Sequence, residues 1–161
     1  MSKNPVQNQR AGRMSATFEE LLARDGYLVF KTSGVSMEPM LRQNRDLVTI
    51  RVPASRLKRY DVALYRRGDA YVLHRVIADK GDRYLIRGDN TYSLENVPDS
   101  AVIGVLTGFQ RKGRQHEVTE KGYRTYARFW HAIYPLRHAC VRFRHLAVRM
   151  AKFEFGRKQH Q

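Results

Sequence analysis

Hydrophobic residues follow a short, interrupted rhythm through the middle of this chain. They occur in runs rich in Val, Ile, Leu and Tyr, which cover residues 27–32, 47–52, 61–65, 71–77, 84–87 and 101–109. Short runs of this composition, divided by turn residues, are typical of antiparallel β structure. Two of the separators, residues 67–69 and 79–82, carry Gly and Asp where hairpins must turn. The middle of the chain is therefore predicted to form a mainly β domain.

The N-terminal end of the chain has two parts. Residues 1–16 show no periodicity and hold three basic residues without an acid, which predicts a disordered tail. Thr17 and Glu20 then have the spacing of a capping box, which marks the start of a helix. Gly26 is suited to end that helix. We therefore expect one short helix before the first strand.

A helical period starts near Glu120. Apolar residues then recur at alternating steps of four and three, at Phe129, Ile133, Leu136, Cys140, Phe143, Ala147 and Met150. Many basic residues and histidines lie elsewhere on the helical wheel, so the segment is expected to form an amphipathic helix. Pro135 cannot lie inside a helix, which predicts a break or a second helix starting there. The expected organisation is a tail (1–16), a β domain (17–119) and a basic helical tail (120–161).

Charge adds a preference for anionic partners. The 161 residues include 30 Lys and Arg against 15 Asp and Glu, a net charge of +15. The excess lies at the ends, with +3 in residues 1–16 and +8 in residues 120–161, which leaves +4 for the middle. No zinc-finger, recognition-helix or aromatic-sheet pattern accompanies it, so nucleic acid is not the favoured partner. Residues 124–153 could bind an anionic membrane through their apolar face, or that face could pack on the chain's own domain or a partner.

Several features are missing from the sequence. Cys140 is the only cysteine, which excludes an intramolecular disulfide and a Cys-based zinc site. No apolar run approaches the ~18 residues of a membrane span, and residues 1–16 lack the apolar stretch of a signal peptide. We expect a cytoplasmic protein or one bound peripherally to a membrane. Neither a cofactor nor a metal is expected.

The first candidate for chemistry is Ser36, within residues 34–41 (GVSMEPML) and just after a predicted strand. A serine hydroxyl becomes nucleophilic when a neighbouring base takes its proton, and the amides of a sharp turn can hold the oxyanion. Pro39 suits the first turn of a helix after this serine. A serine before a proline is also common as a plain turn residue.

Two further candidates follow. Strict alternation places His74 on the same strand face as Val72 and Val76. Burial there would keep the imidazole neutral and able to act as a general base, although most half-buried strand histidines are structural. Residues 87–90 (RGDN) are by default a surface turn after a strand.

In this order and spacing, the segments resemble the signal peptidase I superfamily of serine peptidases, which includes self-cleaving repressor domains. The matching segments are Gly-x-Ser-Met-x-Pro-x-Leu with Gly34, Ser36, Met37 and Pro39, Asp-Val-x-Leu-Tyr at residues 61–65, Leu-His-Arg-Val at residues 73–76, and Arg-Gly-Asp-Asn with Gly88, Asp89 and Asn90. The resemblance covers about residues 31–109. It implies an antiparallel β-sheet or partial barrel with peptidase activity.

The resemblance also implies roles for individual residues. Ser36 matches the nucleophile. Bacterial members commonly have a lysine as the base, whereas the endoplasmic-reticulum-like branch has a histidine at that place, and here the place is filled by His74. Either Asp89 or Glu95, six residues further on, would orient the imidazole, with a slight preference for Asp89 because it matches the box.

The oxyanion hole departs from the family pattern. Many members carry a serine two residues before the nucleophile, where this chain has Gly34, with Ser33 one place earlier. The hole would then use the amide of Ser36 and neighbouring amides, or the Ser33 side chain.

The expected function is a serine endopeptidase that cleaves an extended signal or leader peptide at the membrane. The substrate strand would pair with an exposed sheet edge, either residues 27–33 or the strand near Asp61, with small residues before the cut. Two other functions stay open. One is a catalytically degenerate module that binds peptides or serves as a membrane adaptor, and the other is a basic nucleic-acid-binding protein.

Overall fold

The computed structural model describes residues 16–141. The chain divides into two compact units, Met1–Thr125 and Tyr126–Gln161. The first unit contains all the strands of the described chain and the beginning of helix α2 (Lys121–Ala132). Apart from its last residue, the predicted N-terminal tail lies outside the described residues.

A short helix precedes the sheet, as the capping pattern predicts. α1 (Phe18–Asp25) begins after Thr17, whose hydroxyl accepts the Glu20 amide at 3.2 Å while the Glu20 carboxylate accepts the Thr17 amide at 2.8 Å. Gly26 ends the helix in the left-handed region, at φ +74°. The Phe18 ring stacks on a tyrosine of the sheet with 4.5 Å between centroids, so α1 is fastened to the β structure.

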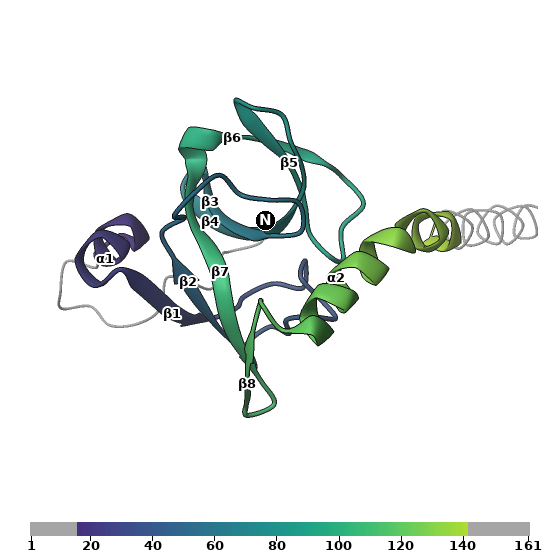
Figure 1. Cartoon of the computed structure of the whole chain (residues 1–161), viewed down its shortest axis with the longest axis horizontal. Helices are drawn as coiled ribbons and strands as arrows, with labels where there is room; N and C mark the ends of the chain where they lie inside the picture. Colours follow the sequence, from purple (N-terminus) through teal and green to yellow (C-terminus); the bar gives the residue numbers. More distant parts are fainter. Residues whose placement is uncertain (1–15, 142–161) are drawn as a thin grey trace, which may run out of the picture. The chain divides into compact units, whose positions relative to one another are not determined.

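Eight antiparallel strands form one open, curved sheet (Figure 1). They are β1 (Tyr27–Lys31), β2 (Leu47–Arg51), β3 (Val62–Arg67), β4 (Ala70–Asp79), β5 (Arg83–Arg87), β6 (Glu95–Pro98), β7 (Val102–Arg111) and β8 (Arg114–Glu117). The order across the sheet is β1-β2-β7-β3-β4-β5-β6, and β8 pairs with β7. A 3-10 helix, η2 (Asp99–Ala101), connects β6 to β7. The mainly antiparallel β class is confirmed, and six of these strands match predicted runs.

The strand order decides which sheet edges are open. β1 pairs with β2 alone, whereas β3 pairs with β4 on one side and β7 on the other. The expectation that the strand near Asp61 is an exposed edge is therefore wrong, because both sides of β3 are already hydrogen-bonded. The alternative edge in residues 27–33 agrees with the position of β1.

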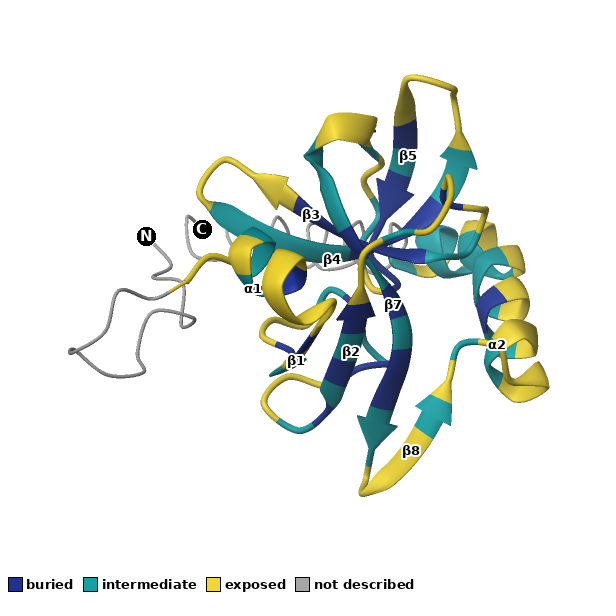
Figure 2. Ribbon diagram, turned by 60° about the vertical axis from the view of Figure 1, so that its left-hand side comes forward, coloured by how far each residue is buried: buried dark blue, intermediate teal, exposed yellow. Residues whose placement is uncertain are grey.

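The core of the first unit lies against the curved sheet. Buried residues run along β2, β5 and β7 (Figure 2). One cluster joins strands that are distant in sequence and consists of Leu57, Ala63, Tyr65, Val76, Tyr84, Ile86 and Val97. Burial of this apolar area drives the sheet to form. It also fixes β3, β4, β5 and β6 side by side.

The segment between β1 and β2 corrects one local expectation. Residues 36–40 form turns and not the helix that Pro39 was expected to begin. The Glu38 amide donates to the Val35 carbonyl at 3.2 Å, and the Leu41 amide to the Met37 carbonyl at 3.0 Å. The chain turns sharply here because apolar side chains of the segment enter the core, including Met37, Met40 and Leu41.

The helical segment breaks where the sequence predicts it. α2 ends at Ala132, Ile133 is a turn residue, and residues 134–141 are helical again, with Pro135 in the first turn. Two helical hydrogen bonds meet at the junction residue, from the Ile133 amide to the Phe129 carbonyl and from the Arg137 amide to the Ile133 carbonyl, each 3.0 Å. The predicted apolar stripe beyond residue 141 lies outside the described residues.

Among residues 16–141, no helix has both the length and the apolar character that crossing a bilayer requires.

Candidate active site

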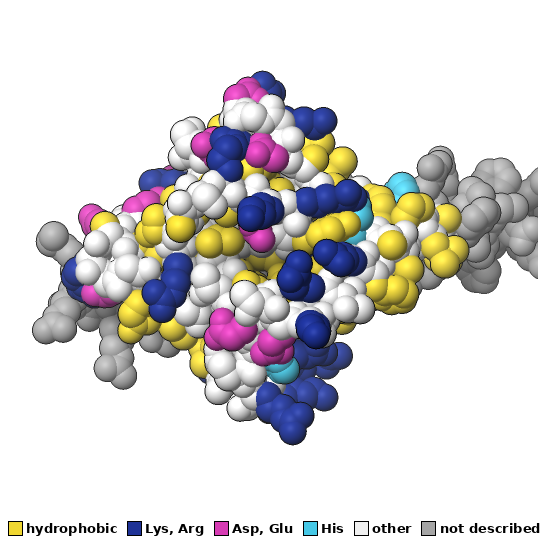
Figure 3. Space-filling model, viewed as in Figure 1, with side chains coloured by type: hydrophobic (Ala, Val, Ile, Leu, Met, Phe, Trp, Pro, Cys, Tyr) yellow, Lys and Arg dark blue, Asp and Glu magenta, His cyan; other side chains and the backbone are white. Residues whose placement is uncertain are grey.

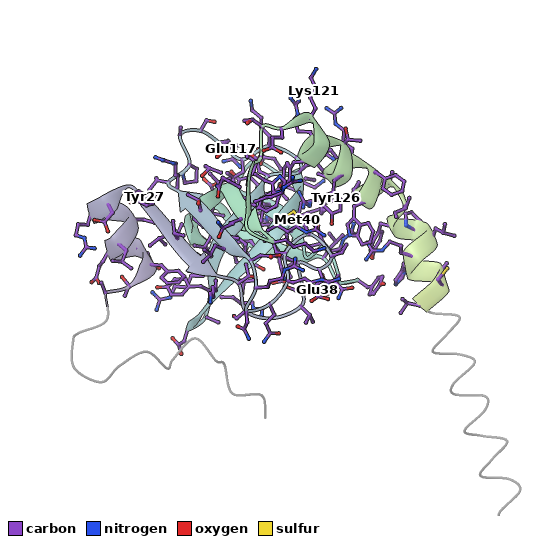
Figure 4. The ribbon with its side chains drawn as sticks, turned by 90° about the horizontal axis from the view of Figure 1, so that it is seen from below. Tyr27, Glu38, Met40, Glu117, Lys121 and Tyr126 are labelled. Atoms are coloured by element: carbon purple, nitrogen blue, oxygen red, sulfur yellow. The ribbon has the colours of Figure 1, made fainter. Side chains whose placement is uncertain are left out.

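The loop that carries Ser36 is closed at its base by a buried carboxylate. Asp46 accepts the Arg42 amide at 2.8 Å and two bonds from the Arg45 guanidinium at 2.6 and 2.7 Å. The Thr32 amide also donates to the Asp46 carbonyl at 3.1 Å. The two ends of the loop are thus tied together. Met40 points into the interior of the first unit (Figure 4).

A second segment fastens the loop directly at Ser36. The Asn90 amide donates to the Ser36 carbonyl at 2.7 Å, and the Asn90 side-chain Nδ2 donates to the Val35 carbonyl at 3.2 Å. Asn90 belongs to a tight turn in which the Thr91 hydroxyl accepts the Gly88 amide at 3.0 Å. The predicted Gly-Asp-Asn box therefore holds the Ser36 loop in place, which is more than the role of a surface turn.

Gly88 marks the point where the serine loop meets His74. A Cβ added at Gly88 would lie 2.6 Å from the Ser36 carbonyl oxygen and 3.0 Å from His74 Nε2. Both atoms therefore border the same small space, which only a glycine leaves free. The Ser36 backbone therefore lies near the His74 ring at this position, although 38 positions separate the two residues in the sequence.

His74 lies near the middle of β4, and its side chain is 6% exposed. Strand pairing explains its neighbours. Ala63 is its partner on β3, so Tyr65 is a diagonal neighbour two residues further along. On the other side β4 pairs with β5, and β5 pairs with β6 so that Ile86 faces Glu95. The sheet therefore brings residues of β3, β4 and β6 to one place.

The Nδ1 side of the His74 ring faces an acid and a hydroxyl. Nδ1 lies 3.1 Å from Glu95 Oε1 and 3.2 Å from the Tyr65 hydroxyl. The Tyr65 hydroxyl donates to Glu95 Oε2 at 2.8 Å, and Arg67 donates to the same oxygen at 3.0 Å. Since the only proton of Tyr65 goes to Glu95, its oxygen can only accept from Nδ1. This network assigns the ring proton to Nδ1 and leaves a lone pair on Nε2.

Burial sets the protonation of this cluster. Desolvation lowers the pKa of His74 below its ordinary value, and the charge of Arg67 adds to this while Glu95 opposes it. Burial alone would raise the pKa of Glu95, but the Tyr65 bond, His74 and Arg67 together hold it below its ordinary value. Burial and the bond to Glu95 raise the pKa of Tyr65. At neutral pH the cluster therefore holds a neutral imidazole, a carboxylate and a protonated phenol.

Asp89 has a different partner from the one expected. Its two carboxylate oxygens accept from Nε and Nη2 of Arg75, each at 2.7 Å. Arg75 is fully buried and also donates to the Tyr60 carbonyl and the Tyr123 hydroxyl, at 2.9 and 3.0 Å. The geometry therefore favours Glu95 over Asp89 as the acid beside His74. Asp89 fastens the 88–91 turn to β4.

The other side of the imidazole is open. Within residues 16–141, the Ser36 hydroxyl and His74 Nε2 have no hydrogen-bond partner and do not bond to each other. Every buried side-chain nitrogen and oxygen of the described residues has a partner, so both of these atoms are reached by solvent. In substrate-free enzymes the bond between nucleophile and base is often long and tightens only in the complex. The arrangement leaves Nε2 free to take a proton.

The candidate oxyanion residues lie at the start of the same loop. Ser33 is exposed, and Gly34 adopts a left-handed backbone conformation with φ +80° that favours glycine. No atom lies within 4 Å of a Cβ added at Gly34. In the described part of the chain, the Ser36 amide has no acceptor. It is therefore free to serve as an oxyanion donor.

Sequence reasoning missed Tyr65 and Arg67. Both lie on β3, and only its register with β4 brings them to His74 and Glu95. The one signal in the sequence was the position of Tyr65 at the end of the Asp-Val-x-Leu-Tyr segment.

No protein-family model matches the chain, and no curated protein matches its sequence.

Proposed function

We propose that the chain is a serine endopeptidase of the signal peptidase I type, with Ser36 as nucleophile, His74 as base and Glu95 as the acid that orients it. The observation that carries the proposal is the placement of the His74 ring. Nδ1 faces Glu95 and the Tyr65 hydroxyl, while Nε2 faces the space that the Ser36 loop borders. A triad needs its imidazole oriented in this way.

The mechanism follows from these positions. The Ser36 hydroxyl attacks the carbonyl carbon of the scissile peptide bond while Nε2 of His74 takes its proton. The backbone amide of Ser36 stabilises the oxyanion. The imidazolium then gives the proton to the departing amine, which leaves an acyl-enzyme on Ser36. Water hydrolyses this ester with His74 again acting as base.

Glu95 stabilises the imidazolium that forms in each step. Tyr65 and Arg67 hold the Glu95 carboxylate in position. Both of them donate to Oε2, so Oε1 is left for the imidazole. Tyr65 and Arg67 are positioning residues in this scheme, since they act on the substrate only through Glu95 and His74.

An extended peptide is the substrate that best fits the sheet. β1 is an open edge, and the chain passes from its end directly into the Ser36 loop. Main-chain bonds to this edge would carry a peptide towards the nucleophile. Tyr27 and Val29 are exposed on β1 and offer apolar contacts to it. The preference for small residues before the cut comes from the family resemblance.

The test uses a pool of unrelated synthetic peptides, with cleavage products identified by mass spectrometry. The full chain should produce defined cuts, and both Ser36→Ala and His74→Ala should abolish them while keeping the native circular dichroism spectrum. Ser55→Ala is the matched control, because Ser55 is an exposed serine in a loop of the same unit. Cleavage that persists in Ser36→Ala would refute the proposal.

Two observations favour a second candidate, a catalytically degenerate peptide-binding module. The Ser36 hydroxyl is not hydrogen-bonded to His74 within the described chain, and Gly34 replaces the family serine. Such a module would retain peptides from the pool, and the retained peptides would be recovered intact.

A further inference from the structure

An exposed apolar stripe follows the helices after the sheet. Phe129 and Leu136 have exposed fractions of 59% and 68%, and Ala132 and Cys140 are also exposed. At about 100° per residue, these four side chains fall within about 80° of the helix circumference. Helical i→i−4 bonds lead into the junction at Ile133 and out of it, so the same angular spacing is applied on both sides of the break. Hydrophobic side chains gather over α2 and the helix that follows it in Figure 3.

Cations border this stripe on both sides. By the same angular spacing, Arg128 and Arg137 lie on opposite sides of it, each within about 60° of its edge. Lys121 lies on the Arg128 side and projects from the start of α2 (Figure 4). Residues 121–141 contain four Lys and Arg and no Asp or Glu. A long basic side chain at the border of an apolar stripe can keep its charge in a polar layer while its stem stays apolar.

Aromatic rings lie on the Arg137 side of the stripe. The Tyr126 and Trp130 rings are stacked with 5.8 Å between centroids, and the Arg137 guanidinium lies 3.8 Å from the Trp130 ring centroid. Tryptophan and tyrosine are the residues that favour the boundary between hydrocarbon and headgroups. The apolar stripe, the cations at its borders and the aromatic rings form one amphipathic surface.

We propose that this surface, residues 121–141, binds the surface of an anionic lipid bilayer. The helices would lie in the plane of the interface, with Phe129 and Leu136 below the headgroups and Arg128 and Arg137 among the lipid phosphates. A second copy of the same surface is a poor occupant, because four cations without an acid would face four more. An anionic membrane is complementary to both the cations and the apolar stripe, since it presents negative charge above an apolar layer.

The protein offers a built-in probe for the test. Trp130 is its single tryptophan, and it stacks beside the stripe. The full chain is titrated with vesicles of phosphatidylglycerol and phosphatidylcholine in equal parts, and with vesicles of phosphatidylcholine alone. The proposal predicts a blue shift of the Trp130 emission and flotation with the anionic vesicles, both weakened by salt. Absence of binding to the anionic vesicles would overturn it.

Two double variants test the cations and the apolar stripe of the surface separately. Arg128→Gln with Arg137→Gln should weaken binding about 25-fold, since each basic residue near an anionic surface contributes roughly a factor of five. Phe129→Ser with Leu136→Ser should weaken it about tenfold or more. The matched controls Lys112→Gln and Val52→Ser remove an exposed charge and an exposed apolar side chain from the first unit and should leave binding unchanged. Equal losses in the variants and their controls would contradict the assigned surface.

Two alternative outcomes are informative. A dimer in light scattering that Phe129→Ser with Leu136→Ser makes monomeric, without vesicle binding, would assign the stripe to a second copy and overturn the proposal. Ser36→Ala should bind vesicles as the unaltered chain does. Loss of peptidase activity and loss of membrane binding are therefore distinguishable, and either proposal can fail alone.

Discussion

Replacing Gly88 by alanine tests the geometry of the candidate site most specifically. The added Cβ would lie 2.6 Å from the Ser36 carbonyl oxygen, which is backbone and cannot swing aside. That carbonyl also accepts the Asn90 amide at 2.7 Å, so its displacement disturbs the contact that fastens the serine loop. Relief of the clash has to widen the gap between the Gly88 turn and the Ser36 loop, and with it the space at His74 Nε2, which lies 3.0 Å from the same Cβ.

The expected magnitudes differ for stability and for activity. Overpacking of this kind costs roughly 1–3 kcal/mol of folding free energy, which a domain of ordinary stability tolerates. A displacement of the nucleophile by about 1 Å costs about 100-fold in rate. Gly88→Ala should therefore keep its fold, lose a few degrees of melting temperature and cleave the peptide pool at least about 100-fold more slowly.

Gly122→Ala provides the matched control. Gly122 lies in α2, and no atom lies within 4 Å of its added Cβ. Alanine is favoured over glycine in helices by up to about 1 kcal/mol, so this variant should be as stable as the unaltered chain or more so, with the same activity. The reasoning fails if Gly88→Ala cleaves at the rate of Gly122→Ala, because the Ser36 loop would then not depend on the space at Gly88.

Two further predictions concern the buried polar groups. Asp89→Asn leaves Arg75 buried without a counter-charge and should lower the free energy of unfolding by about 3–5 kcal/mol in denaturant titrations. Asp79→Asn removes an exposed ion pair and should change the free energy of unfolding little. Equal losses of stability in Asp89→Asn and Asp79→Asn would contradict this account. Tyr65→Phe removes a hydrogen bond to the ionised acid beside His74. It should slow cleavage about 10–100-fold with the fold intact, and an unchanged rate would remove Tyr65 from the mechanism.

Most of the fold can be predicted from the sequence, because the alternation of hydrophobic and polar residues and the turn residues are local signals. The runs at residues 47–52 and 71–77 correspond to β2 and β4, and the glycines of the separators allow the hairpins. The polar strands β6 and β8 carry no such signal. They form because β5 and β7 offer them unpaired backbone groups, and Pro98 is tolerated because β6 is an edge strand.

The candidate site was only partly accessible from the sequence. Ser36 and His74 could be selected by resemblance, but the choice between Asp89 and Glu95 could not be made. The match to the Gly-Asp-Asn box favoured Asp89, whereas the buried Arg75 takes both of its carboxylate oxygens. An ion pair between a strand and the turn that follows its neighbour depends on register and burial, which residue spacing does not encode.

The titration of His74 tests the central claim most directly. Nuclear magnetic resonance would follow the protonation of its ring while kcat/KM for a cleaved peptide is measured over the same pH range, with His74→Gln to assign the signal. Because only the neutral imidazole can take the Ser36 proton, the rate should fall as pH drops through the pKa of His74. Burial places that pKa below its ordinary value, so both midpoints should coincide below about 6.5. A rate that is independent of pH across the titration of His74, or midpoints that differ, would contradict its role as the base.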